Sequence, residues 1–164
     1  VYDFSKGIRA ISSSIRRSIP AFLDSKIHHN NMLSLVIAKM HANIAGFDAA
    51  VMLDERGFVA ELNDTNLFML KNNKVYTPFP HACLPGITRG TFMELLKENN
   101  IEIEERDLTL VEFINADLVF ATGTNGEITP VTEMEGREIN CDQDFLEKIK
   151  NLFEAKLPSL CEPL

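Results

Sequence analysis

AAVMLDERGFVAELNDTNLF, residues 49–68, is the stretch of this sequence that decides the fold. Short apolar runs alternate in it with turn-forming residues, Glu55-Arg56-Gly57 after the first run and Asn63-Asp64 after the second. Apolar runs of about four to eight residues separated by Gly, Asn or Asp are typical of β-strands joined by turns. We therefore predict an antiparallel meander. Its strands are 49–53, 58–61, 67–70 and, after an Asn72-Asn73 turn, 75–77.

Helical periodicity appears on both sides of this meander. Residues 31–45 place apolar side chains at helical spacing and end before Gly46, which predicts a helix that buries its apolar face. That face consists of Leu33, Val36, Ile37, Met40 and Ile44. Two more helices are predicted, one over 88–99 with Thr88 as N-cap and one over 143–155 that ends before Pro158.

Shorter elements complete the pattern. We predict strands at 8–16, 101–106, 118–121 and 129–131, and a helical turn at 110–115. No internal repeat, low-complexity tract or linker interrupts this succession of helices and strands. The sequence therefore predicts a single mixed α/β (α+β) domain that spans residues 1–164.

The composition argues against several classes of protein. Hydrophobic residues make up 45% and charged residues 24%, which is typical of a soluble globular domain. The net charge of −8 argues against a nucleic-acid partner, because that affinity depends on clustered Lys and Arg. The one basic stretch is predicted to be a solvated strand face, with a contact to an acidic partner as the alternative. It contains Lys6, Arg9, Arg16 and Arg17.

The cysteines and the hydropathy pattern indicate the cellular setting. Cys83, Cys141 and Cys161 have neither CxxC nor metal-ligand spacing, so neither a disulfide framework nor a metal site is predicted. No apolar run approaches the roughly 18 to 20 residues that span a bilayer. The N-terminal residues lack the pattern of a signal peptide. We therefore expect a cytoplasmic protein with no membrane partner.

Two segments have the residue types of a phosphate site. LPGIT, residues 84–88, opens a predicted helix, and TGTNG, residues 122–126, follows a buried strand. Backbone N–H groups at a helix N-terminus or in a glycine turn bind anions, and threonine hydroxyls add donors. An ordinary helix cap and an ordinary loop have the same appearance. Likewise, Glu61 at the end of a strand could pair with a protonated ring nitrogen or simply face water.

The ordered combination of segments resembles aminotransferase class IV, the fold-type IV enzymes that use pyridoxal 5′-phosphate (PLP). The matching segments are AAVMLDERGFVAELNDTNLF (49–68), LPGITRG (84–90), ERDLTLVEFINADLVFATGTNGEITPV (105–131) and EGRE (135–138). The family includes branched-chain and D-amino acid aminotransferases and aminodeoxychorismate lyase-like proteins. The resemblance extends from about Lys6 to Arg137 and implies the family's large C-terminal domain, a β-rich pseudo-barrel with flanking helices. A counterpart of the small N-terminal domain is not expected within this chain.

The resemblance implies a role for each matching residue. Glu61 matches the glutamate that keeps the pyridine nitrogen of PLP protonated, and Leu84 matches a residue that packs on the ring. The other matches concern the cofactor phosphate and the substrate carboxylate. Gly86, Ile87 and Thr88 match the first phosphate site, Gly123 and Thr124 match the second, and Thr124 with Asn125 matches the carboxylate site.

The lysine that forms the Schiff base in this family has no direct counterpart. DSKIHHNNMLSLVIAK, residues 24–39, fits the family pattern without a gap and places His28 at the lysine position. Lys26 lies two residues earlier, so on an extended strand it would share a face with His28 at a distance of about 7 Å. Lys26 is therefore the candidate substitute for the missing lysine.

Two functions follow from this pattern. The first is a PLP-dependent aminotransferase, or a related lyase, that acts on an amino acid and a 2-oxo acid. The second is a non-catalytic PLP-fold protein that binds a ligand or a partner, because His28 cannot hold PLP covalently. The resemblance also implies a homodimer and allows the N-terminal domain to be a separate partner chain.

Overall fold

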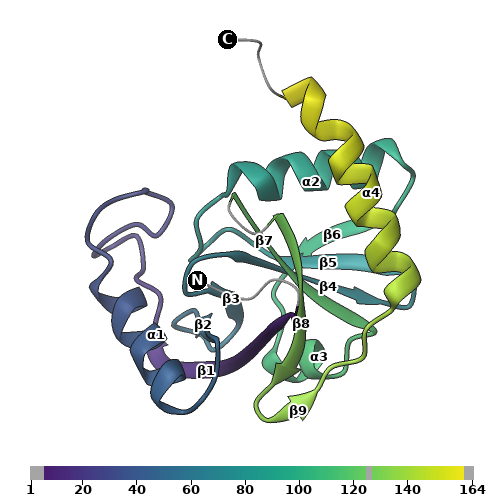
Figure 1. Cartoon of the computed structure of the whole chain (residues 1–164). Helices are drawn as coiled ribbons and strands as arrows, with labels where there is room; N and C mark the ends of the chain where they lie inside the picture. The colour runs from purple at the N-terminus through teal and green to yellow at the C-terminus, as the bar shows by residue number, and fades with distance from the viewer. Residues whose placement is uncertain (1–5, 125–126, 161–164) are drawn as a thin grey trace.

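A computed structural model describes residues 6–124 and 127–160, which form one curled sheet with four helices around it (Figure 1). The strands are β1 Ile8–Arg16, β2 Ala49–Leu53, β3 Val59–Leu62, β4 Asn66–Lys71, β5 Lys74–Pro78, β6 Ile103–Arg106, β7 Leu118–Gly123, β8 Glu127–Met134 and β9 Arg137–Glu138. The helices are α1 Leu33–Ile44, α2 Ile87–Glu98, α3 Leu110–Ile114 and α4 Gln143–Leu160. The predicted α/β class is confirmed.

The strand order is β3-β2-β1-β8-β7-β4-β5-β6, with β9 paired to β8. The predicted meander is therefore wrong in part. β2 pairs with β3 and β4 pairs with β5 as antiparallel hairpins, but β4 takes β7 rather than β3 as its other neighbour. Local apolar runs and turns specify each hairpin, whereas the partner of β4 is about fifty residues away in the sequence, beyond the reach of local patterns.

The turn between β3 and β4 directs the chain from one half of the sheet to the other. The amide of Leu62 donates to the carbonyl of Thr65 at 2.9 Å, and the amide of Asn63 donates to Ala50 at 2.9 Å. The side chain of Asn63 in turn accepts a bond from the Ala50 amide at 2.9 Å. These bonds hold the 63–66 turn against β2, next to the point where β7 ends.

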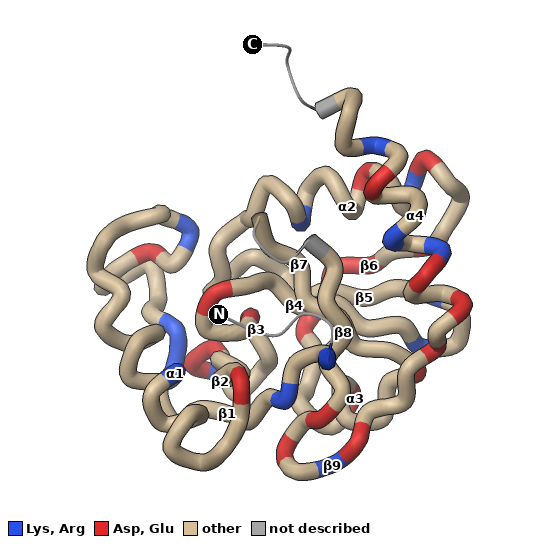
Figure 2. The backbone as a smooth tube through the Cα atoms, in the orientation of Figure 1, with Lys and Arg blue, Asp and Glu red and all other residues tan. Residues whose placement is uncertain are grey.

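The sheet is buried on both faces, which explains the apolar strands. Along β4, Leu67 and Met69 point to the core layer that contains Phe113 of α3. Phe68 and Leu70 point to the opposite layer, under α2 and α4 (Figure 1). In that layer Phe68 stacks on Phe120 with ring centroids 5.3 Å apart, and Phe92 of α2 meets both rings edge-on. Charged residues lie mainly on turns and outer elements such as β6 and the β8–β9 hairpin (Figure 2).

Helix α1 does not bury the face that its periodicity predicts. It packs on β1 and β2 through Ala38 and Ala42, which are fully buried. Four of the five predicted core residues are exposed instead, Leu33 at 66%, Val36 at 51%, Met40 at 54% and Ile44 at 82%, and Ile37 is half-buried. Two small alanines bring the helix close to the sheet, so the larger side chains point outward.

Two helix ends also differ from the predictions. Helix α2 begins at Ile87 with Gly86 as its N-cap, so Thr88 lies inside the first turn and is not the cap. Helix α4 continues through Pro158 to Leu160. Proline has no backbone N–H to donate, so the helix continues past Pro158 without the hydrogen bond that another residue would make there. Within the part of the chain that the structure describes, no helix is long and apolar enough to cross a bilayer.

Candidate functional site

A cavity of about 410 Å³ lies where the N-terminus of α2 meets the end of β7. Cavities of this size typically hold small molecules. The structure brings every predicted site residue that it describes into the wall of this one cavity. They are Lys26, His28, Glu61, Leu84, Gly86, Ile87, Thr88, Gly123 and Thr124. Asn125 lies outside the described residues.

The two glycine-containing segments are positioned by the turn between β3 and β4. A Cβ on Gly86 would collide with the side-chain oxygen of Asn66, and a Cβ on Gly123 would lie 2.8 Å from Cγ2 of Thr65. The Asn66 side chain also donates to the carbonyl of Leu84 at 2.9 Å. Close approach therefore requires glycine at both positions, and it places both segments at the same cavity.

The first turn of α2 presents unpaired backbone donors to the cavity. Gly86 is extended, with φ −60° and ψ 141°, and makes no side-chain cap bond to the helix. The first N–H groups of a helix have no intrahelical partners, and the helix dipole favours an anion there. Ile87 and Thr88, which carry two of these groups, both line the cavity.

Two buried hydroxyl groups in the cavity wall lack partners within the described residues. Oγ1 of Thr65 and Oγ1 of Thr122 are buried and make no hydrogen bond. Buried polar atoms in native proteins are nearly always bonded, so such atoms in a cavity wall suit a polar ligand. Together with the α2 terminus, they fit an anionic group such as a phosphate. No three His, Cys, Asp or Glu side chains among residues 6–124 and 127–160 are arranged to hold a metal ion.

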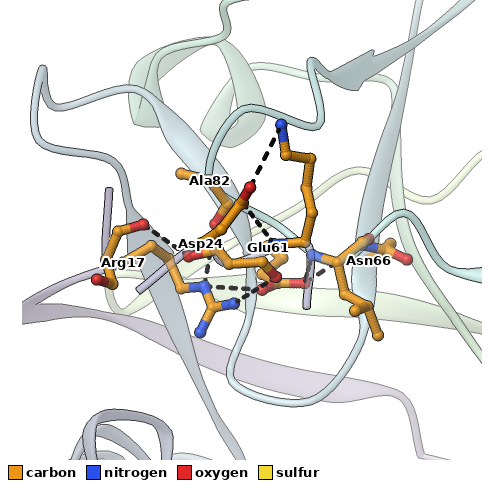
Figure 3. Close-up of polar contacts among 9 residues, drawn as sticks. Arg17, Asp24, Glu61, Asn66 and Ala82 are labelled. Carbon is orange, nitrogen blue, oxygen red and sulfur yellow. Dashed lines mark hydrogen bonds and ion pairs between the residues drawn. The ribbon is translucent and has the colours of Figure 1, made fainter. Parts of the chain in front are cut away.

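Glu61 is a buried residue of the cavity wall and is held by three donors (Figure 3). Nε of Arg17 forms an ion pair with Oε1 at 2.9 Å. The side chain of Asn66 and the amide of Leu84 both donate to Oε2 at 3.3 Å. Burial raises the pKa of Glu61 to about 7, although Arg17 and the Leu84 amide act to lower it. The carboxyl group is thus fixed in place and poised to share a proton near neutral pH.

Arg17 is the residue at this site that the sequence did not reveal. The prediction of a solvated basic face is wrong for it, because its side chain is 9% exposed and paired with Glu61. Its guanidinium also donates to the carbonyls of Ala82 at 3.0 Å and Ser25 at 3.4 Å. Arg9 in the same stretch is 49% exposed and pairs with Glu133. Only the position of Arg17 directly after a strand distinguished it, and that position does not indicate which residue it pairs with.

The pKa of Glu61 predicts how the stability of the free protein depends on pH. Between its ordinary value of 4.5 and about 7, the unfolded chain loses the Glu61 proton while the folded chain keeps it. This group's contribution to stability is therefore lost as pH rises through that window, by at most about 3.5 kcal/mol at roughly 1.4 kcal/mol per pKa unit. The contribution is measured by urea unfolding of the unmodified chain and of Glu61→Gln at several pH values. If the difference between their free energies of unfolding is the same at every pH, the raised pKa of Glu61 is contradicted.

Lys26 and His28 line the same cavity but not as neighbours on a strand. The chain makes a turn at 24–27, closed by a bond from the Ile27 amide to the Asp24 carbonyl at 3.0 Å. The expected extended geometry is therefore wrong, and the turn rather than strand alternation brings both side chains to the cavity. Nζ of Lys26 lies 3.8 Å from Oδ2 of Asp24; the lysine side chain is exposed, Asp24 is half-buried, and His28 is exposed.

The chain is similar to branched-chain aminotransferases over most of its length. The family model for amino-transferase class IV matches residues 2–134. The branched-chain-amino-acid aminotransferase-like protein 2 of Arabidopsis thaliana is 51% identical over 139 residues, which are 85% of this chain and 25% of that protein. The branched-chain-amino-acid aminotransferase of Pseudomonas aeruginosa is 38% identical over 139 residues, 82% of this chain and 44% of that protein.

A solved structure shows the same fold. The branched-chain amino acid aminotransferase of Thermobaculum terrenum, in its PLP-form, has a TM-score of 0.87 and 27% identity, over 96% of this chain and 53% of that one. The chain thus spans between a quarter and about half of the length of these relatives. The predicted fold-type IV architecture is confirmed. The cavity geometry, the matching segments and the family model together show that this chain belongs to aminotransferase class IV.

Proposed function

We propose that this chain is the PLP-binding domain of an aminotransferase that acts on branched-chain amino acids and their 2-oxo acids. One observation carries the proposal: two anion-binding segments, a buried carboxyl group and a lysine meet in one cavity of about 410 Å³. The family match and the names of the relatives support the reaction and the substrate class, and the PLP-form of the Thermobaculum terrenum protein supports the cofactor. The non-catalytic alternative receives no support from them.

Different residues are assigned to different parts of the cofactor. When bound, PLP supplies an electron sink for the carbanion that forms at the substrate Cα. We assign the phosphate to the first turn of α2 with Thr88 and to Thr124 after β7. Glu61 then accepts a hydrogen bond from the ring N–H and keeps that nitrogen protonated. Leu84 packs against the ring, and its amide fixes the carboxyl of Glu61.

Several finer predictions are proposals of the same kind. We propose that Thr124 and Asn125 receive the substrate carboxylate, that the active protein is a homodimer, and that a small N-terminal domain completes the substrate pocket. Activity as a lyase or on D-amino acids is the other outcome that the resemblance allows. Transfer of an amino group to bound PLP from L-leucine but not from D-alanine, followed by absorbance, would support the branched-chain assignment. The reverse preference would contradict it.

The phosphate assignment predicts a selective loss of affinity. Thr124→Val is expected to weaken PLP binding by about tenfold or more, because a hydrogen bond to a charged group contributes about 1.5–3 kcal/mol. Binding of pyridoxal, which has no phosphate, should not change. Titration of each ligand by fluorescence, with Thr91→Val on α2 as the matched control, measures both affinities. Equal weakening of PLP and pyridoxal would show that Thr124 does not contact the phosphate.

A further inference from the structure

We propose that this chain binds a free α-amino acid with an uncharged polar side chain in a second cavity, separate from the cofactor site. This cavity has a volume of about 380 Å³, close to the 410 Å³ of the cofactor cavity, and the two share no lining residue among those described. Cavities of this size typically hold small molecules. Its wall is formed by the β4–β5 turn with β5, the segment that joins α2 to β6, and the first turns of α4 (Figure 1).

The two cavities lie at opposite ends of the same two elements. Strand β4 begins with Asn66 in the wall of the cofactor cavity and leads into the Asn72-Asn73 turn in the wall of the second. Helix α2 begins at Ile87 in the first cavity and is followed by Asn99 in the second. A helix has a partial positive charge at its N-terminus and a partial negative charge at its C-terminus. The end of α2 in the second cavity therefore favours a cationic group.

Charged side chains of both signs line the second cavity, which favours a zwitterion. The carboxylate of Glu102 is 77% exposed, and its ion pair with Nζ of Lys74 is long, at 3.6 Å. Lys74 also pairs with Glu104 at 2.9 Å, so Glu102 remains able to accept an ammonium group. Lys148 of α4 is exposed and forms no ion pair with any described residue. We assign the ammonium group of the ligand to Glu102 and the end of α2, and its carboxylate to Lys148.

Amide side chains make up much of the remaining wall. Three of the asparagines have a left-handed backbone, with φ of 51° at Asn72, 62° at Asn73 and 55° at Asn100, and the fourth is Asn99. Asparagine adopts this conformation more readily than most other non-glycine residues, so the two turns hold these residues at the cavity. An amide offers both N–H donors and an acceptor oxygen. The wall therefore suits a ligand whose side chain is polar and uncharged.

The aromatic residues of the wall argue against a sugar as the ligand. A sugar ring packs well on the open face of an aromatic ring. Phe145 is only 8% exposed, so its ring is not open to the cavity. Nζ of Lys74 lies 5.6 Å and Cζ of Arg106 lies 4.7 Å from the centroid of the Tyr76 ring, so cations already cover that ring. The charged groups and the amides, rather than aromatic stacking, therefore decide which ligand binds.

Calorimetric titration with L-glutamine tests the inference. The protein is first saturated with PLP, so that the cofactor cavity is filled, and L-glutamine is then expected to bind saturably. Two analogues each lack one charge: glutaric acid monoamide has no ammonium group, and 4-aminobutanamide has no carboxylate. Each analogue should bind about tenfold or more weakly than L-glutamine, because each loses one hydrogen-bonded charge.

Variants of the two charged residues locate the binding site. Lys148→Met and Glu102→Gln are each expected to weaken L-glutamine binding by about tenfold or more. The affinity for PLP should not change, which shows that the variants are folded. Lys150→Met on α4 and Glu94→Gln on α2 are the matched controls, because neither residue lines the cavity. Both controls should bind L-glutamine like the unmodified chain.

The outcomes separate this inference from the proposed function. Absence of L-glutamine binding, equal binding of the two analogues and L-glutamine, or equal binding by Lys148→Met, Glu102→Gln and the unmodified chain would each overturn the second site. The cofactor site would remain in place, because PLP binding is measured separately. Loss of PLP binding with retained, charge-dependent L-glutamine binding would overturn the proposed function alone.

Discussion

Arg17→Met is expected to destabilise the folded chain by about 3–5 kcal/mol at pH values where Glu61 must remain ionised. The reason is that removal of one partner of a buried ion pair leaves the charge of the other uncompensated. Arg17 and Glu61 are 9% and 7% exposed, and their charged atoms are 2.9 Å apart. The loss should shrink as pH falls, since burial already raises the pKa of Glu61 to about 7 and an unpaired Glu61 can take up a proton. Urea unfolding across this pH range gives the free energies.

A double variant separates the ion pair from the other contacts of Arg17. Arg17→Met/Glu61→Gln removes both charges, so it should recover most of the stability that Arg17→Met loses. The remaining deficit reports the bonds from Arg17 to the carbonyls of Ala82 and Ser25. If the double variant is as unstable as Arg17→Met, those carbonyl bonds rather than the charge of Glu61 account for the role of Arg17.

Glu61→Gln is expected to slow amino-group transfer by about 10²–10³-fold. This is the usual effect of removing one preorganised group that stabilises the charge developing in a transition state. A glutamine side chain cannot hold a proton on the pyridine nitrogen, so the ring withdraws electrons less strongly. The rate is measured in the PLP-loaded protein. The nitrogen chemical shift of ¹⁵N-labelled PLP reports the protonation state independently of activity.

The control for this prediction is Glu55→Gln, an exposed carboxylate in the turn between β2 and β3. It should alter neither the rate nor the nitrogen shift. A protonated ring nitrogen in Glu61→Gln with an unchanged rate would show that Glu61 is structural and that another group governs the ring.

Much of the site could be predicted because its parts are local. Gly86 and Gly123 mark segments where the backbone must approach Asn66 and Thr65 closely, and such segments are visible as short glycine-containing motifs. Glu61 stands at a fixed position before a turn. The family resemblance then supplied the order of these motifs and the roles that remain predictions.

Other features could not be predicted because they depend on which segments of the chain pack against one another in the folded protein. The periodicity of α1 correctly indicated a helix, but the exposed Leu33, Val36, Met40 and Ile44 show that periodicity does not say which face the chain covers. Arg17 follows a strand in the sequence like any solvated residue, and only the fold places it beside Glu61.

The sequence by itself determined most of the elements, the two hairpins and the glycine turns, because these depend on interactions between residues close together in the chain. The tertiary structure alone decided that β4 pairs with β7, that Arg17 is buried against Glu61, and that a turn carries Lys26 and His28 to the same cavity. Those features join segments far apart in sequence, and long-range pairing and burial depend on the whole packed core rather than on local residue pattern.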